Sequence, residues 1–273
     1  ARVIWVADDN TGDYASLSEA LAAITDATSS NPYVIKIAPG EYTENSNVAM
    51  ENYVDVEGSG QNTTTITCVC SSTNFDASSA VISAGAITAE IRHLTINNTG
   101  SSNGASYGVY TEGVVDGSFS MLHVTATATN SYNNTGVRNA SSSPTMNNVT
   151  ATATGGSFGT FGFGVSNNSS SPTMNNVTAT ATGGSNNYGM YNFSSSSPTM
   201  NNVTATATGG TFSFGVTNVS SSFPSIRNSS ITGSTNSIRN DSTLAQVADT
   251  ELGGGVTGGG FTCVGAYNAA FVA

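Results

Sequence analysis

The chain has 273 residues, only 8% of them charged, and its formal net charge at pH 7 is −11. This acidic balance, with Lys36 as the single lysine, excludes a nucleic-acid-binding protein, because phosphates are bound by clustered lysine and arginine. No apolar run can span a bilayer and no basic segment precedes an apolar stretch, so we expect no membrane span and a mature chain that begins at Ala1 after signal removal.

Residues 1–32 are predicted to form an N-terminal cap. Val3–Val6 is a short apolar strand, and Ser16 with Glu19 forms a capping box that opens a helix extending to about Ile24. The apolar stripe of this helix is Leu17, Ala20, Leu21 and Ile24. A cap is expected here because an uncovered first coil would expose unpaired backbone groups.

Three cysteines follow as candidate disulfide partners: Cys68, Cys70 and Cys263. Cys68 and Cys70 share one strand face, which is a poor geometry for a bond between them. Cys263 lies near the far end of the chain, so an intramolecular bridge to it requires the tail to fold back. The odd count leaves an intermolecular disulfide and buried free thiols as alternatives.

A fourteen-residue phrase, SPTMNNVTATATGG, occurs three times and starts at Ser143, Ser171 and Ser197. Its prolines and that of a degenerate fourth copy, Pro224, are separated by 28, 26 and 26 residues. A fixed period in this range is typical of a solenoid in which each repeat stacks on its neighbours.

Each repeat predicts three short strands. Alternation of Val or Ala with Thr, as in Val149–Thr154, gives a strand with one apolar face. A second strand carries an aromatic residue, Gly and an apolar residue, as in Phe163–Asn167, and the third is Ser-Pro-Thr-Met. Three strands and three turns in about 26 residues describe one coil of a right-handed parallel β-helix. An antiparallel sandwich is the alternative, and the strict register of the repeats disfavours it.

Stacking of equivalent residues about 4.8 Å apart predicts columns of like side chains. One interior column is Val137, Val165, Met190, Val216 and Ile238. An amide ladder beside it is Asn139, Asn167, Asn192, Asn218 and Asn240. The turn corner is lined by His93, His123, Asn148, Asn176, Asn202 and Asn228. We interpret the two histidines as members of this corner column and not as metal ligands.

Threonines repeat on the outward side of the alternating strands. They form a candidate interaction face of four rows: Thr125, Thr127 and Thr129; Thr150, Thr152 and Thr154; Thr178, Thr180 and Thr182; Thr204, Thr206 and Thr208. Three readings stay open: an ice-binding lattice, a β-branched solvent face, and a face that packs against another subunit or a polysaccharide.

The predicted organisation is a cap at 1–32, a parallel β-helix at 33–250 and a C-terminal tail or cap at 251–273. The N-terminal stretch VADDNTGDYASLSEALAAI, followed by PYVIKIAPGEYTENSNV and YVDVEGSGQNTTTIT, resembles the opening of pectin methylesterases and related pectin-lyase-like β-helix proteins. The tail from Pro224 resembles the ends of bacterial secreted β-helix repeat proteins. The resemblance implies the fold, a helical cap over the first coil, and a location outside the cell or on its surface.

Catalytic groups are sparse. Between Asp116 and Asp241 the chain has no Asp or Glu, which removes paired carboxylates and a carboxylate calcium cage from that stretch. The resemblance to pectin methylesterases implies two catalytic aspartates and an arginine on the body strands, and no matching motif is present. One small cluster can be drawn around Arg92, formed by Glu90, Glu112, Asp116 and His93. We interpret these residues as solvated or ion-paired. The acidic stretch Asp8–Asp13 is interpreted as a turn, with weak calcium binding as the alternative.

From these observations we expect a secreted or cell-surface, non-enzymatic structural solenoid without a cofactor, which binds itself in a filament or binds a polysaccharide. An ice-binding protein and a carbohydrate-active enzyme of the pectin-lyase-like type are the alternatives. Most Asn-x-Ser/Thr triplets coincide with ladder positions. The candidate glycosylation sites in predicted loops are Asn62, Asn97 and Asn133.

Overall fold

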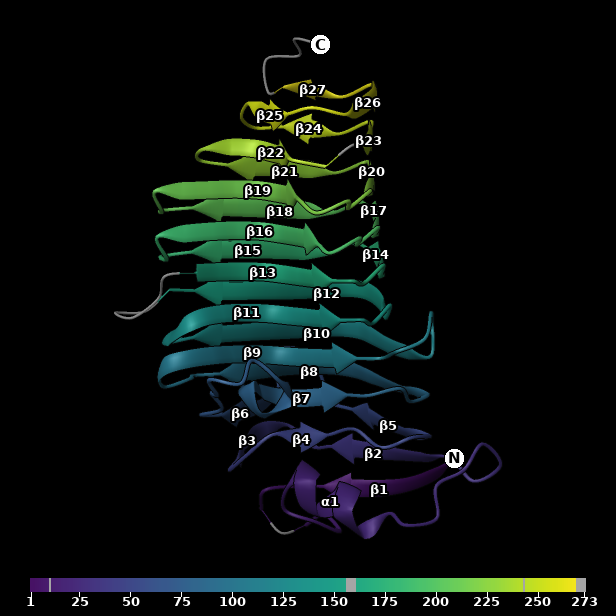
Figure 1. Cartoon of the computed structure of the whole chain (residues 1–273). Helices are drawn as coiled ribbons and strands as arrows, with labels where there is room; N and C mark the ends of the chain where they lie inside the picture. Colours follow the sequence, from purple (N-terminus) through teal and green to yellow (C-terminus); the bar gives the residue numbers. More distant parts are fainter. Residues whose placement is uncertain (10, 156–160, 243, 269–273) are drawn as a thin grey trace.

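The computed structural model describes residues 1–273 except 10, 156–160, 243 and 269–273. The chain winds into a right-handed parallel β-helix whose coils stack from the N-terminal helix α1 (Leu17–Ala23) to the last strands of the chain (Figure 1). Its strands form two sheets, one of 18 strands and one of nine. The larger sheet bends along its length, so the solenoid has three outward sides, which we call faces I, II and III.

Face I comprises β1 (Arg2–Val6), β2 (Tyr33–Ile37), β5 (Val54–Glu57), the first parts of β8 (Ala89–Asn98), β10 (Phe119–Thr129) and β12 (Thr145–Thr154), then β14 (Thr173–Asn175), β17 (Thr199–Asn201), β20 (Ser225–Arg227), β23 (Ala245–Ala248) and β26 (Phe261–Val264). Face II comprises β3 (Gly40–Glu44), β6 (Thr64–Cys68), the second parts of β8, β10 and β12, then β15 (Thr178–Thr182), β18 (Thr204–Thr208), β21 (Ser230–Gly233), β24 (Glu251–Leu252) and β27 (Tyr267–Asn268). Face III comprises β4 (Val48–Ala49), β7 (Ala80–Ala84), β9 (Ser102–Glu112), β11 (Ser131–Ala140), β13 (Phe161–Asn168), β16 (Asn186–Phe193), β19 (Phe212–Asn218), β22 (Asn236–Asn240) and β25 (Val256–Gly258). A short 3-10 turn, η1 (Ala77–Ser79), precedes β7.

The three copies of the repeated phrase lie directly over one another, as predicted. Thr150 aligns with Thr178, and Thr178 with Thr204, in parallel pairs. The corner between faces I and II is formed by single residues in the left-handed region, with φ of 53° at Asn148 and 54° at Asn176. Asn tolerates this conformation, which explains its recurrence at the corner. Every strand pair that joins the described coils is parallel, so the antiparallel sandwich is excluded.

Apolar side chains fill the interior in continuous columns. The predicted column Val137, Val165, Met190, Val216 and Ile238 is aligned and fully buried. Beside it runs a seam of glycine against alanine that joins faces II and III. A Cβ added at Gly164 would lie 2.6 Å from the backbone N of Thr180 and 2.8 Å from the carbonyl carbon of Ala179. We call this the glycine–alanine seam, and it leaves no room for a larger residue at the glycine position.

The buried amide ladder is confirmed for four of its five predicted members. Asn139 donates to Asn167, Asn167 to Asn192, and Asn192 to Asn218, each over 2.8 Å. The prediction is wrong for Asn240. It aligns with Asn218, but its amide donates to backbone carbonyls, and the Nδ2 of Asn218 is left without a partner. The last turns therefore depart from the repeat.

The corner column is confirmed as well. Asn176 donates to Asn148 and Asn202 donates to Asn176, continuing the outward ladder through three coils. In the preceding coils, the rings of His93 and His123 stack with centroids 5.1 Å apart. Both histidines have the left-handed backbone of the corner, with φ of 58° at His93 and 50° at His123, so they belong to the corner column as predicted.

Helix α1 covers the first coil at the N-terminal end (Figure 1). Ser16 accepts from the backbone N of Glu19, as the capping box predicts, while the Glu19 carboxyl accepts from the N of Ala15 and not from that of Ser16. Glu44, which is 4% exposed, accepts from the backbone N of Leu17 at 2.9 Å and so links the helix start to β3. A negative group at a helix N-terminus is favourable, and here it fixes the cap on the solenoid.

We expect Asn192→Ala to lower the free energy of unfolding by about 2 to 4 kcal/mol, because it leaves the Asn167 amide and the Asn218 carbonyl oxygen buried without partners. Asn175→Ala is the matched control, since Asn175 makes an equivalent bond to Asn147 on the outside, where water can replace it. The control should lose less than about 0.5 kcal/mol. Denaturant unfolding measures both, and equal losses would contradict a structural role for the buried ladder.

Candidate functional site

The threonine face is assembled on face II as predicted. Thr125, Thr150, Thr178 and Thr204 align in one column, and the columns of Thr127 and Thr129 run parallel to it. Each of these side chains is half-buried or exposed, while the alanines between them are buried. The role of this face in binding stays a prediction.

The predicted geometry of the cysteines is wrong. Cys68 and Cys70 form a disulfide with each other, their Cα atoms 5.3 Å apart. Strand β6 ends at Cys68, and the chain then leaves the sheet, so the two side chains are not held on one regular strand. Cys263, on β26, is free and exposed.

Two of the three glycosylation candidates do not lie in loops. Asn97 is in β8 and Asn133 is in β11. Asn97 also accepts a hydrogen bond from Thr127 at 2.7 Å. Asn62 is the candidate that lies in an exposed turn.

The acidic cluster around Arg92 differs from the expected one. The Arg92 guanidinium binds Glu90 at 2.7 Å and Glu57 at 2.8 Å, and it lies 3.5 Å from Asp55. Lys36 binds the other oxygen of Glu57 at 3.1 Å. In the described part of the chain, the ion-pair partners of Arg92 do not include Glu112, Asp116 or His93. Each described carboxyl group of this cluster is therefore paired, which fits the interpretation of an ion-pair network on face I.

The hydrogen bond from Arg92 holds the pKa of Glu57 below its ordinary value, burial opposes this shift, and Lys36 adds to it. The turn at Asp8–Asp13 has internal partners too. Asp9 accepts from the backbone N of Thr11, and Asp13 accepts from the N of Trp5. Both regions are thus explained by local structure.

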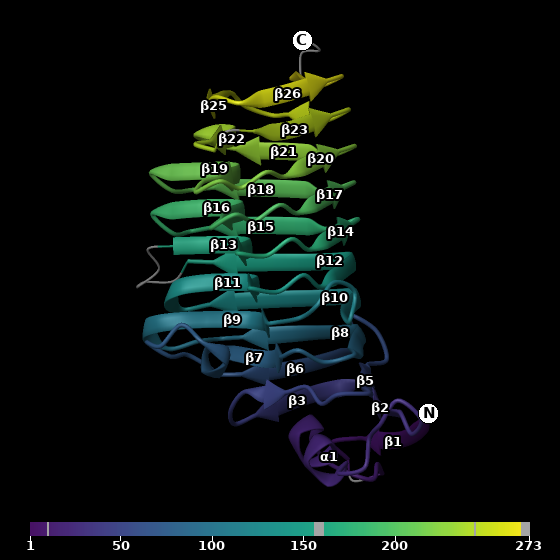
Figure 2. The ribbon, with the colours of Figure 1, turned by 45° about the vertical axis from the view of Figure 1, so that its right-hand side comes forward.

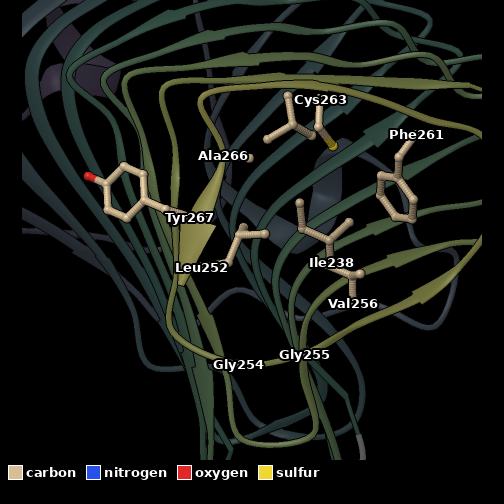
Figure 3. Close-up of a pocket in the computed structure, with 10 residues that line it drawn as sticks. Ile238, Leu252, Gly254, Gly255, Val256, Phe261, Cys263, Ala266 and Tyr267 are labelled. Carbon is tan, nitrogen blue, oxygen red and sulfur yellow. The ribbon is translucent and has the colours of Figure 1, made fainter. Parts of the chain in front are cut away.

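A cavity of about 370 Å³ opens at the C-terminal end of the solenoid (Figure 3). Its lining includes Ile238, Leu252, Val256, Phe261 and Cys263, which surround the hollow in the close-up. Ile238 is also the last member of the interior column. The cavity is therefore the open end of the core, and none of its described lining residues carries a charge.

Face III carries a surface that differs from both other faces. Its strands β9, β11, β13, β16, β19 and β22 lie over one another along the solenoid (Figure 2). Aromatic side chains gather on their outward side, and we call them the aromatic surface: Tyr132, Phe161, Phe163, Tyr188, Tyr191, Phe193 and Phe214.

Ring contacts make the aromatic surface continuous over several coils. Phe163 stacks on Tyr188 with centroids 5.2 Å apart, and Tyr188 stacks on Phe214 at 6.0 Å. Tyr191 lies beside this column, 5.0 Å from Tyr188. At its far end Arg239 lies over the Phe214 ring and pairs with Asp241. Phe214 is buried, while the other six rings are half-buried or exposed. Aromatic pairs stabilise a sheet, and a contiguous group of rings that solvent reaches is also typical of a binding surface.

The N-terminal end of the aromatic surface holds polar groups. Tyr107 and Tyr110 of β9 stack with centroids 5.8 Å apart, and Arg138 of β11 lies over the Tyr107 ring. Burial raises the pKa of Tyr107 to about 12. Burial also raises the pKa of Tyr110, and the charge of the nearby Glu112 adds to the rise. Both hydroxyls therefore stay protonated near neutral pH.

Comparisons with known proteins agree with this architecture. The family model Pectinesterase matches residues 3–109, which is less than half of the chain. No curated protein matches the sequence significantly. A pectin methylesterase from carrot is 15% identical with a TM-score of 0.55, covering 100% of this chain and 84% of its own. A pectin methylesterase from Yersinia enterocolitica is 12% identical with a TM-score of 0.56, covering 95% and 92%.

A pectate lyase, Pel9A, is 15% identical with a TM-score of 0.60, covering 98% of this chain and 77% of its own. Together with the coordinates, these likenesses establish the pectin-lyase-like β-helix fold. The expectation of a non-enzymatic structural protein is wrong, because both the family match and the solved relatives are pectin-active enzymes. No helix in the described ranges is long and apolar enough to cross a membrane.

The cysteine arrangement gives a direct test. We expect a thiol-specific reagent to label Cys263 alone in the native, unreduced protein, because Cys68 and Cys70 are bonded to each other. Peptide mass mapping before and after reduction measures the labelling. Labelling of Cys70 without reductant would contradict the disulfide.

The Arg92 network predicts a pH dependence of stability. A carboxyl group with a depressed pKa contributes stability above its unfolded-state value, and this is lost as the pH falls through the folded-state value. We expect the midpoint temperature of thermal unfolding to decrease as the pH is lowered from about 5 to about 3. The variant Glu57→Gln should have a lower midpoint temperature at neutral pH and should lose less of it as the pH is lowered. Glu41→Gln, at an exposed position of β3, is the control and should keep the wild-type slope.

Proposed function

We propose that the protein is a carbohydrate-active enzyme that hydrolyses ester groups of an acidic, pectin-like polysaccharide bound along face III. The aromatic surface carries this proposal. Sugar rings present apolar C–H groups that pack on aromatic rings, and a polymer needs contacts that repeat along its length. Phe163 and Tyr188 supply such contacts on consecutive strands, and the half-buried Tyr191 lies beside them. The pectinesterase match and the solved relatives support the same substrate class.

Glu112 is the carboxyl group that we assign to the chemistry. Of the acids near the aromatic surface, Asp241 is paired with Arg239, and Asp76 accepts from both the backbone N and the hydroxyl of Ser78. Glu112 is exposed at the end of β9, lies beside the Tyr110 hydroxyl, and forms no ion pair with any described residue. It can therefore take a proton from a water molecule at the ester carbonyl.

In this reaction the water oxygen forms a bond to the ester carbonyl carbon while one water proton moves to Glu112. The bond from that carbon to the alcohol oxygen then breaks, and the proton passes from Glu112 to the departing alcohol. The products are a free carboxylic acid and an alcohol. The Tyr110 hydroxyl, which stays protonated beside Glu112, is a hydrogen-bond donor at this end of the surface.

An extracellular location is part of the proposal. A polysaccharide substrate of this kind is met outside the cell, and the disulfide between Cys68 and Cys70 fits an oxidising compartment. The low density of charge, with hydroxyl and amide side chains on faces I and II, agrees with a surface exposed to a hydrated polymer.

The test is release of methanol from methyl-esterified polygalacturonate, measured by a coupled alcohol oxidase assay. We expect the wild-type protein to release methanol and Glu112→Gln to lose at least about 100-fold in rate, as removal of a general base does. Tyr191→Ala should weaken polymer binding while leaving folding intact, because Tyr191 is half-buried on the outside of β16.

Glu41→Gln is the control, since Glu41 lies exposed on face II and away from the aromatic surface. Its rate should equal that of the wild type. The proposal would be rejected if the wild-type protein released neither methanol from several methyl-esterified polyuronates nor acetate from acetylated ones. Unchanged turnover in Glu112→Gln would reject the assignment of the base but not the activity.

A further inference from the structure

Arg138 is unusual among the cations of this chain. The sequence holds six lysines and arginines in total. Four of them form ion pairs: Arg2, Lys36, Arg92 and Arg239. Arg138 and Arg227 form none with any described residue. In a chain with a net charge of −11, an arginine left without a carboxylate partner calls for an explanation.

The two unpaired arginines differ in their surroundings. Arg227 is exposed on face I, where water can solvate its guanidinium. Arg138 is half-buried on face III, with its guanidinium 5.5 Å from the centre of the Tyr107 ring. Its Nε atom is shielded from solvent and has no hydrogen-bond partner in the described part of the chain. A shielded donor without a partner costs about 1 to 3 kcal/mol, which a ligand acceptor would recover.

Neither acid near Arg138 forms an ion pair with it in the described part of the chain. Glu112 lies beside the Tyr110 hydroxyl, and Asp76 accepts two hydrogen bonds from Ser78. The neighbours of Arg138 across the strands are Tyr110 on β9 and Ser166 on β13, neither of which carries a charge at neutral pH. The guanidinium is thus held in place by stacking while its charge remains available.

We infer that Arg138 binds the carboxylate of a uronate residue and selects acidic over neutral sugars on the aromatic surface. A guanidinium presents parallel N–H donors that match the two oxygens of a carboxylate, and stacking on Tyr107 orients this fork before the ligand arrives. The aromatic rings of β13 begin on the next strand, so a sugar bound by Arg138 lies next to rings that can pack against it. This inference rests on the proposed binding of an acidic polysaccharide to face III.

The test compares a galacturonic acid hexamer with an uncharged galactan hexamer by isothermal titration calorimetry. We expect Arg138→Gln to weaken hexagalacturonate binding at least about tenfold and to leave binding of the neutral hexamer unchanged. Arg138→Lys keeps the charge but loses the parallel N–H donors, so its affinity for hexagalacturonate should lie between those of the wild type and Arg138→Gln. It replaces Arg138→Gln in the test if that variant proves unstable. Arg227→Gln, the other unpaired arginine, should bind as the wild type does.

Several outcomes would overturn this inference. They are wild-type affinity for hexagalacturonate in Arg138→Gln, an equal loss for both hexamers, or no hexagalacturonate binding by the wild-type protein. Methanol release is measured on the same variants to separate the two proposals. If the protein releases methanol and still prefers the charged hexamer when Arg138 is replaced, this inference is contradicted and the proposed activity is not. If uronate binding depends on Arg138 but no ester is hydrolysed, the proposed activity is contradicted and this inference is not.

Discussion

The fold depends on the placement of identical side chains over one another in successive parallel coils. The amides of Asn139, Asn167, Asn192 and Asn218 illustrate the constraint, because each is buried and is hydrogen-bonded to its equivalent in a neighbouring coil. A shift of one residue in any coil would turn its amide to the opposite side of the strand and leave the neighbouring amides without partners. The ladder thus favours one register with a free-energy difference that apolar contacts alone would not supply.

This register also distributes chemistry among the three faces. A side chain that points outward in one coil points outward in all, so threonine accumulates on face II and aromatic residues on face III. Charge is concentrated in the early coils, where the Arg92 network and Glu44 tie the cap and the first strands together. The proposed site lies on face III, where Glu112, at the end of β9, meets the start of the aromatic surface.

The repeats made most of the architecture predictable. The parallel coils, the interior column and the corner residues followed from a period near 26 residues and from alternation within strands. The capping helix followed from the capping box of Ser16 and Glu19 and from its apolar stripe. Asn240 could not be predicted correctly, because its ladder bond depends on the irregular turns that follow it and not on its own motif. The disulfide was missed because pairing of Cys68 with Cys70 depends on where β6 ends. Asn97 and Asn133 were placed in loops because the early coils lack the clear phrases of the later ones.

The site was harder to anticipate than the fold. The recurrence of Phe or Tyr before Gly was visible at Phe163, Tyr188 and Phe214, but it indicated a strand and not a surface. Only the coordinates show that Tyr191, Phe161 and Phe193 join them from other positions. Glu112 was noted among acids near Arg92, whereas the structure places it beside Tyr110 on another face. Such neighbours come from different coils, and no short motif records them.

The glycine–alanine seam has a consequence for how chains of this type can change in length. Gly136, Gly164 and Gly189 meet nearly the same neighbours in each coil, so every junction between central coils has the same shape. Removing or duplicating one complete unit of the repeated phrase would join surfaces that already fit one another. Genetic recombination between the near-identical phrases could therefore lengthen or shorten the aromatic surface by whole coils, and so set the number of sugar residues that it contacts, without any new packing having to evolve.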